Sequence, residues 1–293
     1  MANYSIKDLE NFTGIKAHTI RIWEKRYSVV EPKRTDTNIR YYDDDDLKKL
    51  LNVSILNKHG FKISSIANFS NQAIHEKVMN LAHTSNDVES QIESLVLAMI
   101  DLDGSKFDKV FNTAVLNMGF EDTILQVIYP FFQKIGLLWL IGTINPAQEH
   151  YISNLLRQKL IVAIEGLVEP TAADSKSFLL FLPEGEHHEL GLLFFHYLLK
   201  KHNHKVFYLG ESVPFAALTE TAKFKQFDAV VAALVTSRTR EDVSDYINRL
   251  SAEFKDSKVY ITGQQVESYE LDLPENVSLI KDVTEFKKRL IRI

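Results

Sequence analysis

The chain contains no cysteine among its 293 residues. This absence excludes disulfide bonds, thiolate metal sites and cysteine nucleophiles, and it fits an intracellular protein. Long apolar runs are also lacking, because the longest ones are interrupted at Gly136, Gly142 and Pro146. No segment approaches the length that spans a membrane. The N-terminal segment has no apolar signal core, and we therefore expect a cytoplasmic protein without a membrane partner.

Acidic residues outnumber basic ones, but the excess is uneven along the chain. The formal net charge is −5, from 34 Lys and Arg against 39 Asp and Glu. Residues 1–70 hold 12 basic and 9 acidic residues, so this segment carries about +3 and the remainder about −8. A basic first segment on an acidic body indicates a polyanionic partner for the first segment alone.

The first segment has the pattern of two short helices joined by a tight turn. A helix begins after Ser5, which has capping-box spacing to Asp8. A turn at Thr13–Ile15 and a second helix over Ala17–Arg26 follow. Such a pair forms a helix-turn-helix, whose second helix enters the major groove of DNA. The candidate DNA contacts on this helix are Lys16, His18, Thr19, Arg21 and Arg26.

A β-hairpin wing is expected next. Residues 32–42 have a turn-rich centre with basic and aromatic flanks. Its candidate phosphate contacts, which position a domain without reading base sequence, are Arg34, Arg40 and Tyr41. The aspartate run Asp43–Asp46 precedes a helix over Leu47–Lys58. Because anions are favourable at a helix N-terminus, a helix start explains this run better than a metal site does.

These residues resemble the MerR family of winged-helix regulators over about 70 positions. The resemblance rests on Tyr4–Leu9, Thr13–Ile15, Thr19–Tyr27, Arg40–Tyr42 and His59–Ile66. The Trp-Glu-x-Arg-Tyr form at Trp23–Tyr27 is typical of MerR proteins that carry cobalamin-binding domains. The resemblance implies a transcriptional regulator with no enzymatic activity, similar to the light- and cobalamin-responsive repressors of carotenogenesis. It would bind double-stranded operator DNA as a homo-oligomer, a dimer or a tetramer. A generic three-helix bundle is the alternative.

Residues 71–168 have a helical pattern, in which apolar side chains such as Ile92, Leu95, Val96 and Met99 recur at three- and four-residue steps. Four amphipathic helices with short links predict a bundle. Within it, Trp139 precedes Glu149 and His150 by about ten positions. On spacing alone, the tryptophan could belong to the core and the Glu-His pair to a solvated helix face.

The pattern changes after Pro170, where five apolar strands alternate with helical segments. This alternation predicts a parallel five-stranded sheet with helices on both faces. The expected strands are Phe178–Leu182, Val206–Leu209, Ala229–Leu234, Val259–Ile261 and Val277–Ile280.

A histidine loop follows the first of these strands. It places His188 at the carboxyl end of a strand, where ligands bind in open α/β sheets. A loop histidine can offer a neutral nitrogen to a metal, and the nearby carboxylates Glu186 and Glu189 could orient its ring. Glu149, Glu186 and His188 could also form an acid–base set, but one sequence gives no geometry for it.

Two motifs resemble those of cobalamin-binding modules. Glu186-x-His188-x-x-Gly191 is similar to the Asp/Glu-x-His-x-x-Gly motif of cobalamin-binding flavodoxin-like domains, which implies that His188 is the lower ligand to cobalt. Trp139 with Glu149–His150 resembles the Trp-x9-Glu-His motif of helical caps, which contacts the upper corrin face. The other implied cofactor-binding positions are Val235, Thr236 and Gly263. The implied cofactor is cobalamin, as adenosylcobalamin or methylcobalamin.

The expected organisation is therefore multidomain. A winged helix-turn-helix with a small β wing would occupy residues 1–72, a four-helix bundle that caps the cobalamin residues 73–171, and a flavodoxin-like α/β domain residues 172–293. In this hypothesis, corrinoid binding controls operator binding.

Three positions depart from the resembled pattern. Ala233 stands where a serine is expected, Gln264 stands where a second glycine is expected, and Leu140 stands where members that form a photoadduct often have histidine. One alternative is consequently a regulator whose cobalamin fold is degenerate and responds to another small molecule or to a protein partner. A corrinoid shuttle for methyl transfer is a further alternative, which the fused DNA-binding segment disfavours.

Overall fold

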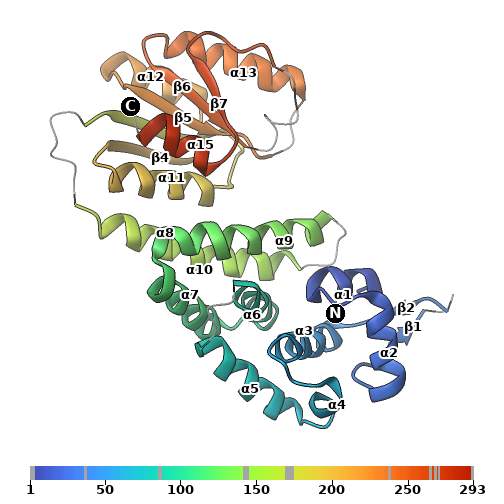
Figure 1. Cartoon of the computed structure of the whole chain (residues 1–293). Helices are drawn as coiled ribbons and strands as arrows, with labels where there is room; N and C mark the ends of the chain where they lie inside the picture. Colours follow the sequence, from blue (N-terminus) through green and yellow to red (C-terminus); the bar gives the residue numbers. More distant parts are fainter. Residues whose placement is uncertain are drawn as a thin grey trace. The chain divides into compact units, whose positions relative to one another are not determined.

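The computed structural model describes residues 4–35, 38–84, 88–140, 145–168, 175–236, 239–263, 266, 269 and 271–291. Contacts divide the chain into two compact units, residues 1–155 and 156–293, and the division falls inside helix α10. The first unit is helical apart from a small hairpin, and the second contains a sheet (Figure 1). Within the described ranges, no helix combines the length and apolar character needed to cross a bilayer.

The first part of unit one is a winged helix-turn-helix, as predicted. Its caps confirm two details of the prediction. Ser5 and Asp8 form the capping box of α1. Asp43 caps α3 by accepting hydrogen bonds from the backbone N–H groups of Asp45 and Asp46. The elements are α1 (Ile6–Thr13), α2 (Ala17–Tyr27), β1 (Lys33–Arg34), β2 (Arg40–Tyr41), α3 (Asp44–Lys58) and α4 (Ile63–Ile66).

Further helices follow, and one of them lies at the centre of the unit. In α6, every residue from 93 to 100 is buried, because α6 packs against α7, η1 and α9 on the bundle side and against α3 of the winged helix. The winged helix and most of the bundle therefore form one compact unit. The elements are α5 (Asn71–Thr84), α6 (Val88–Asp101), α7 (Gly104–Met118), α8 (Phe120–Thr123), the π-helix η1 (Ile124–Ile128), α9 (Tyr129–Leu140) and α10 (Pro146–Glu165).

The sheet of unit two has all five predicted strands, and all of its pairings are parallel, which confirms that prediction. The strands are β3 (Ser177–Pro183), β4 (Lys205–Val213), β5 (Ala229–Ala233), β6 (Lys258–Thr262) and β7 (Val277–Ile280). Their order is β4-β3-β5-β6-β7, which is the flavodoxin-like order. Strand β4 continues beyond the predicted end at Leu209 to Val213. In this extension Gly210 and Ser212 adopt positive φ, and the register with β3 shifts.

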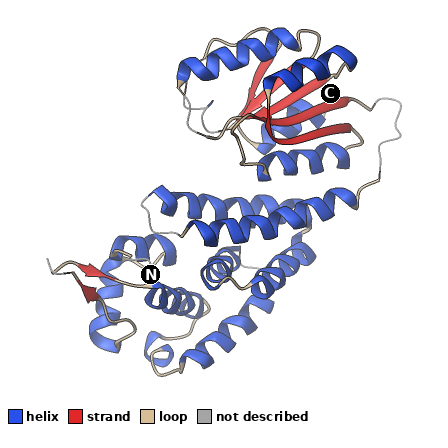
Figure 2. Cartoon of the chain, turned by 180° about the vertical axis from the view of Figure 1, so that it is seen from behind, coloured by secondary structure: helices blue, strands red, loops and turns tan. Residues whose placement is uncertain are grey.

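Helices cover both faces of the sheet (Figure 2). On one face, Phe195 of α11 (Leu190–Lys201) stacks on Phe286 of α15 (Val283–Phe286), with ring centroids 3.9 Å apart. On the other face, Phe215 of α12 (Phe215–Phe224) meets Tyr246 of α13 (Arg240–Glu253) edge to face. A second π-helix, η2 (Lys287–Ile291), follows α15.

Candidate functional site

The outward face of α2 carries three of the five DNA contacts predicted for this helix, His18, Arg21 and Arg26. Ile20 and Trp23 are buried against the domain, so the opposite side of the helix faces solvent. The sequence prediction did not include two residues of this face. It omitted Ile22 because it selected polar residues, and it omitted Lys25 because it favoured the leading end of the helix. The helical period counted from His18 would have found both. The exposed residues of the outward face are His18, Arg21, Ile22, Lys25 and Arg26.

The other predicted contacts have neighbours within the domain. At the N-cap of α2, Lys16 Nζ lies 2.9 Å from Glu10 Oε1. Thr19 Oγ1 lies 3.3 Å from His18 Nε2. In the wing, Arg34 donates to the carbonyl oxygen of Asn38 at 3.2 Å and to its side-chain oxygen at 2.6 Å, and so holds the hairpin. In β2, Arg40 is exposed and Tyr41 is half-buried.

In the second unit, a buried carboxylate joins two loops at the carboxyl edge of the sheet. Glu186 lies in the loop after β3, and it accepts hydrogen bonds from the N–H groups of Val235 at 2.8 Å and Thr236 at 2.6 Å, in the loop after β5. It also accepts from the N–H groups of His187 at 3.1 Å and His188 at 3.2 Å. The strand order reverses between β3 and β5, and this switch point is where open α/β sheets bind ligands.

The same carboxylate orients the imidazole of His188. The Nδ1 atom of His188 lies 2.6 Å from Glu186 Oε1. Burial opposes ionisation of Glu186, but hydrogen bonds from His188, Thr236 and Val235 outweigh it and hold the pKa of this carboxyl well below its usual value. An ionised carboxylate at Nδ1 favours the tautomer that carries the lone pair on Nε2, the form in which histidine ligates a metal.

Glu189 has a different set of contacts from those of Glu186. Its carboxylate is buried and accepts hydrogen bonds from Arg157 of α10 and, at 2.7 Å, from the hydroxyl of Tyr208 in β4. Burial raises the pKa of Tyr208, and its hydrogen bond to Glu189 raises it further, so the hydroxyl stays protonated. The ring of Tyr208 stacks on His196 with centroids 5.4 Å apart. Glu189 therefore fixes the start of α11, directly after His188.

The predicted cap residues lie at the ends of two helices of the first unit. Trp139 belongs to α9, but its side chain and that of Leu140 lie outside the described residues. In α10, Glu149 accepts from the hydroxyl of Ser153 at 2.6 Å, and its other oxygen lies 3.4 Å from Nδ1 of His150. His188 belongs to the second unit, so the pairing of these residues around one ligand stays a prediction.

The structure requires glycine at one of two glycine positions in the predicted site, Gly263, but not at the other, Gly191. At Gly263 the φ angle is +115°, and a Cβ would lie 2.2 Å from the carbonyl oxygen of Leu234. The close approach of two backbones therefore requires glycine there. At Gly191 an added Cβ would meet no heavy atom of the described chain within 4 Å. Ala233 is buried at the end of β5, and Gln264 lies outside the described residues.

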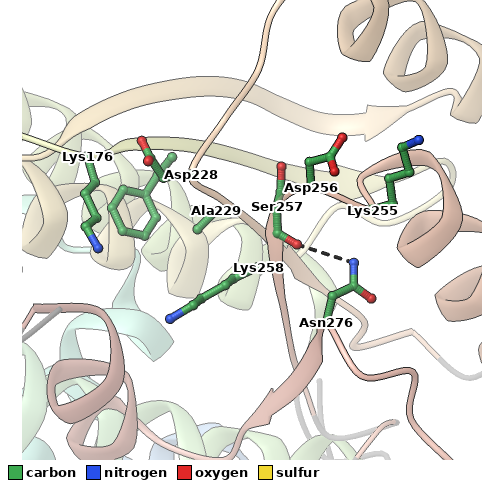
Figure 3. Close-up of a pocket in the computed structure, with 9 residues that line it drawn as sticks. Lys176, Asp228, Ala229, Lys255, Asp256, Ser257, Lys258 and Asn276 are labelled. Atoms are coloured by element: carbon green, nitrogen blue, oxygen red, sulfur yellow. Dashed lines mark hydrogen bonds between the residues drawn. The ribbon is translucent and has the colours of Figure 1, made fainter.

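A pocket of about 400 Å³ lies at the other edge of the sheet, where the strands begin (Figure 3). Two of its polar side chains, Asn276 and Asp228, form hydrogen bonds within the chain. Asn276 donates to the carbonyl oxygen of Ser257 at 3.3 Å, and Asp228 accepts from the N–H and hydroxyl groups of Ser177, each at 2.7 Å. The pocket is therefore separate from the His188 loop. No group of three or more potential metal ligands occurs in the described part of the chain.

Comparisons with known families match two segments of the chain. Residues 4–73 match the family described as MerR HTH family regulatory protein. Residues 91–163, from α6 to α10, match the family described as B12 binding domain. The second match includes Trp139, Glu149 and His150. The first match confirms the resemblance to MerR regulators, and the second confirms the resemblance to cobalamin-binding modules. The Glu186–Gly191 motif lies outside both matched segments, so its role stays a prediction.

Two relatives from Myxococcus xanthus align over most of the chain. The HTH-type transcriptional repressor CarH is 29% identical over 253 residues, which cover 84% of each chain. The HTH-type transcriptional repressor CarA is 27% identical over 244 residues, covering 83% of this chain and 80% of its own. Alignments of this extent must reach into the α/β unit.

Among solved structures, the Methanosarcina barkeri monomethylamine corrinoid protein is 15% identical, with a TM-score of 0.44 over 76% of this chain and 99% of its own. A similarity at this level supports no inference about function. The longer sequence alignments and the two segment matches carry the assignment. The chain thus combines a MerR-type helix-turn-helix region with a B12-binding-domain region, and it is homologous to the repressors CarH and CarA.

Proposed function

We propose that this chain is a DNA-binding transcriptional regulator that senses a corrinoid and changes its affinity for an operator. The observation that carries the proposal is His188, held by a buried carboxylate at the switch point of the sheet, in a chain that begins with a MerR-type helix-turn-helix. The long alignments to repressors favour regulation over methyl transfer. The protein would act in the cytoplasm, as a dimer or tetramer on repeated half-sites.

The residues of the His188 loop fit cobalamin, as adenosylcobalamin or methylcobalamin. His188 would be the lower ligand to cobalt through Nε2, since Glu186 binds Nδ1. Cobalamin would supply a cobalt centre that can exchange its ligands. The packing of the described chain does not require glycine at Gly191. The reason for this glycine would instead be the ligand, since a residue without a side chain leaves room for the nucleotide tail. The tail would also lie near Val235, Thr236 and Gly263, and the cap residues Trp139, Glu149 and His150 would contact the upper corrin face.

Coupling of the two functions needs a contact between the cap and the DNA-binding segment, since an effector acts only through its differential affinity for two states. Such a contact exists within unit one. Lys134 of α9 donates to the carbonyl oxygen of Phe12, and Ser54 of α3 donates to that of Thr13 at 2.8 Å. These carbonyls end α1, immediately before the turn that positions α2. Because α9 also carries Trp139, a shift of α9 on ligand binding would reach the helix-turn-helix.

The ligand proposal is tested with two neighbouring histidines. His187 and His188 are both 65% exposed at their side chains, and both lie beside a carboxylate, Glu211 at 2.9 Å and Glu186 at 2.6 Å. We expect wild-type protein with adenosylcobalamin to give an absorption spectrum different from that of the free cofactor. His188→Ala should lose that difference, and His187→Ala should keep it. A wild-type spectrum identical to that of free adenosylcobalamin refutes corrinoid binding.

The wing assignment predicts a change in salt dependence. Arg40 is exposed on β2, and a phosphate contact there would raise affinity for all DNA sequences alike. Arg40→Ala should therefore reduce the slope of log affinity against log salt concentration by about 1. A filter-binding titration over a salt series measures this slope. An unchanged slope contradicts a phosphate contact by Arg40.

One observation favours the alternative of a degenerate corrinoid fold. The buried Ala233 ends β5 where a serine hydroxyl would help to hold the nucleotide tail. If the regulator answers to another small molecule or a protein partner, its control of transcription should persist in cells that neither make nor take up corrinoids. Loss of control in such cells, with recovery on addition of cobalamin, excludes this alternative.

A further inference from the structure

The outward face of α2 has one apolar side chain, Ile22, at its centre, and basic residues surround it. His18, Ile22 and Lys25 are spaced i, i+4 and i+7, so they form one stripe along the helix, and Arg21 and Arg26 flank it. The side chain of Ile22 is 46% exposed, whereas the other aliphatic residue of α2 with a branched side chain, Ile20, is fully buried. Ile22 therefore contributes little to the core of the winged helix, and it lies where a groove-binding helix meets its partner.

The chemistry of the major groove offers one apolar partner for such a side chain. Each base pair presents hydrogen-bond donors and acceptors there, and thymine alone among the four bases adds a methyl group, at C5. Isolated exposed apolar residues are common on protein surfaces, so exposure alone carries no conclusion. The position of Ile22 between His18, Arg21 and Lys25 is what directs its side chain toward bases when the basic residues engage phosphates or guanines.

We propose that Ile22 is a specificity-determining residue that recognises the C5-methyl group of a thymine in the operator. This inference rests on the proposed DNA-binding function and deepens it. Burial of one methyl group against an isoleucine side chain corresponds to an affinity change of about three- to fivefold. The contact selects thymine over cytosine at one position of each half-site. Arg21 and Arg26 would then supply affinity and hydrogen-bond readout on either side.

The test removes either the C5-methyl group from the DNA or the branched side chain from residue Ile22. A DNA fragment is first selected from a random pool by the full-length wild-type protein, with and without adenosylcobalamin. Each thymine of the selected site is then replaced in turn by deoxyuridine, which lacks only the C5-methyl group. Binding is measured for wild type and for Ile22→Ala. This substitution should preserve folding, because the residue is exposed and alanine has the higher helix propensity.

The expected result is that deoxyuridine at one position per half-site weakens wild-type binding about three- to fivefold and leaves Ile22→Ala unaffected. Ile39→Ala is the matched control, since Ile39 is also exposed in the same domain but lies beside β2 in the wing. It should keep the deoxyuridine effect. A wild type insensitive to every deoxyuridine, or an effect that persists in Ile22→Ala, overturns this inference alone. Failure of the protein to enrich any DNA overturns the proposed function with it.

Discussion

Replacement of Glu186 by alanine is expected to lower the free energy of unfolding of the α/β unit by about 3 kcal/mol. The side chain is fully buried, and its two oxygens accept hydrogen bonds from four backbone N–H groups and from the ring of His188. Alanine leaves these donors without their acceptor at the point where the loops after β3 and β5 meet. A buried donor left unsatisfied costs about 1 to 3 kcal/mol, and water entering the edge of the sheet would satisfy some of them.

The measurement must report on the second unit, and tryptophan fluorescence does not. Both tryptophans, Trp23 and Trp139, lie in residues 1–155. Hydrogen–deuterium exchange of peptides from β3 and β5 over a denaturant series reports on the sheet directly. The matched control is Glu211→Ala, which removes a carboxylate from the neighbouring histidine, but one whose side chain is 48% exposed. It should change stability by less than about 1 kcal/mol.

The effect of Glu186→Ala on stability should depend on pH, because the pKa of Glu186 is lowered in the folded protein. A carboxyl whose folded pKa is depressed contributes stability above its unfolded value, about 4.5, and loses it as the pH falls toward the folded value. The stability difference between wild type and Glu186→Ala should therefore be largest near neutral pH and shrink below about pH 4. A difference that is constant over this range would mean that the charge of Glu186 is not what organises the two loops.

Much of the fold could be predicted from local sequence because local physics determines it. Buried parallel strands need uninterrupted apolar runs, and all five such runs became strands. Caps need an oxygen at a fixed offset, and Ser5 and Asp43 provide it. One part of the role of Glu186 could be predicted, its contact with the ring of His188, because the two residues are only two positions apart. Its bonds to Val235 and Thr236 depend on β3 and β5 being neighbours in the sheet, which strand runs alone do not show.

Residues whose partners are distant could not be predicted. Glu189 was expected to help orient His188, but its carboxylate binds Arg157, 32 positions earlier, and Tyr208, 19 positions later. Glu93 gives a second case. The apolar period of α6 marks Ile92, Leu95 and Met99 as one buried face, which leaves Glu93 toward solvent. The structure buries Glu93 completely, because α3 packs against α6. A helical period reveals one apolar face and says nothing of a second neighbour.

Because the carboxylate of Glu93 is buried beside Lys58, Lys58→Met should destabilise the first unit by about 3 kcal/mol. Lys58 Nζ lies 2.7 Å from Glu93 and 2.7 Å from Glu89, across the seam between α3 and α6. The Oε2 atom of Glu93 has no hydrogen-bond partner among the described residues. Removal of Lys58 thus leaves a fully buried carboxylate without its ion-pair partner, although the charge of Lys134 still acts on it. Breaking one side of a buried pair is strongly destabilising.

A matched control lies at the other end of the same seam. Lys48 Nζ is 2.6 Å from Asp101, and its side chain is 30% exposed, as is that of Lys58. The difference is the partner, because Asp101 is 36% exposed and Glu93 is fully buried. Lys48→Met should therefore cost less than about 1 kcal/mol. Denaturant unfolding followed by tryptophan fluorescence measures both variants, since both tryptophans belong to this unit.

Two further results separate buried charge from lost packing. Burial raises the pKa of Glu93, and Lys58 partly offsets this rise. A carboxyl with a raised folded pKa destabilises the fold as the pH rises above its ordinary value, about 4.5, toward the folded value. The deficit of Lys58→Met should therefore be smallest in acid and grow as the pH rises toward neutral. Adding Glu93→Gln removes the charge at nearly constant volume and should restore most of the loss. If the double variant is as unstable as Lys58→Met, the cost lies in packing, and the ionic seam does not hold the winged helix to the bundle.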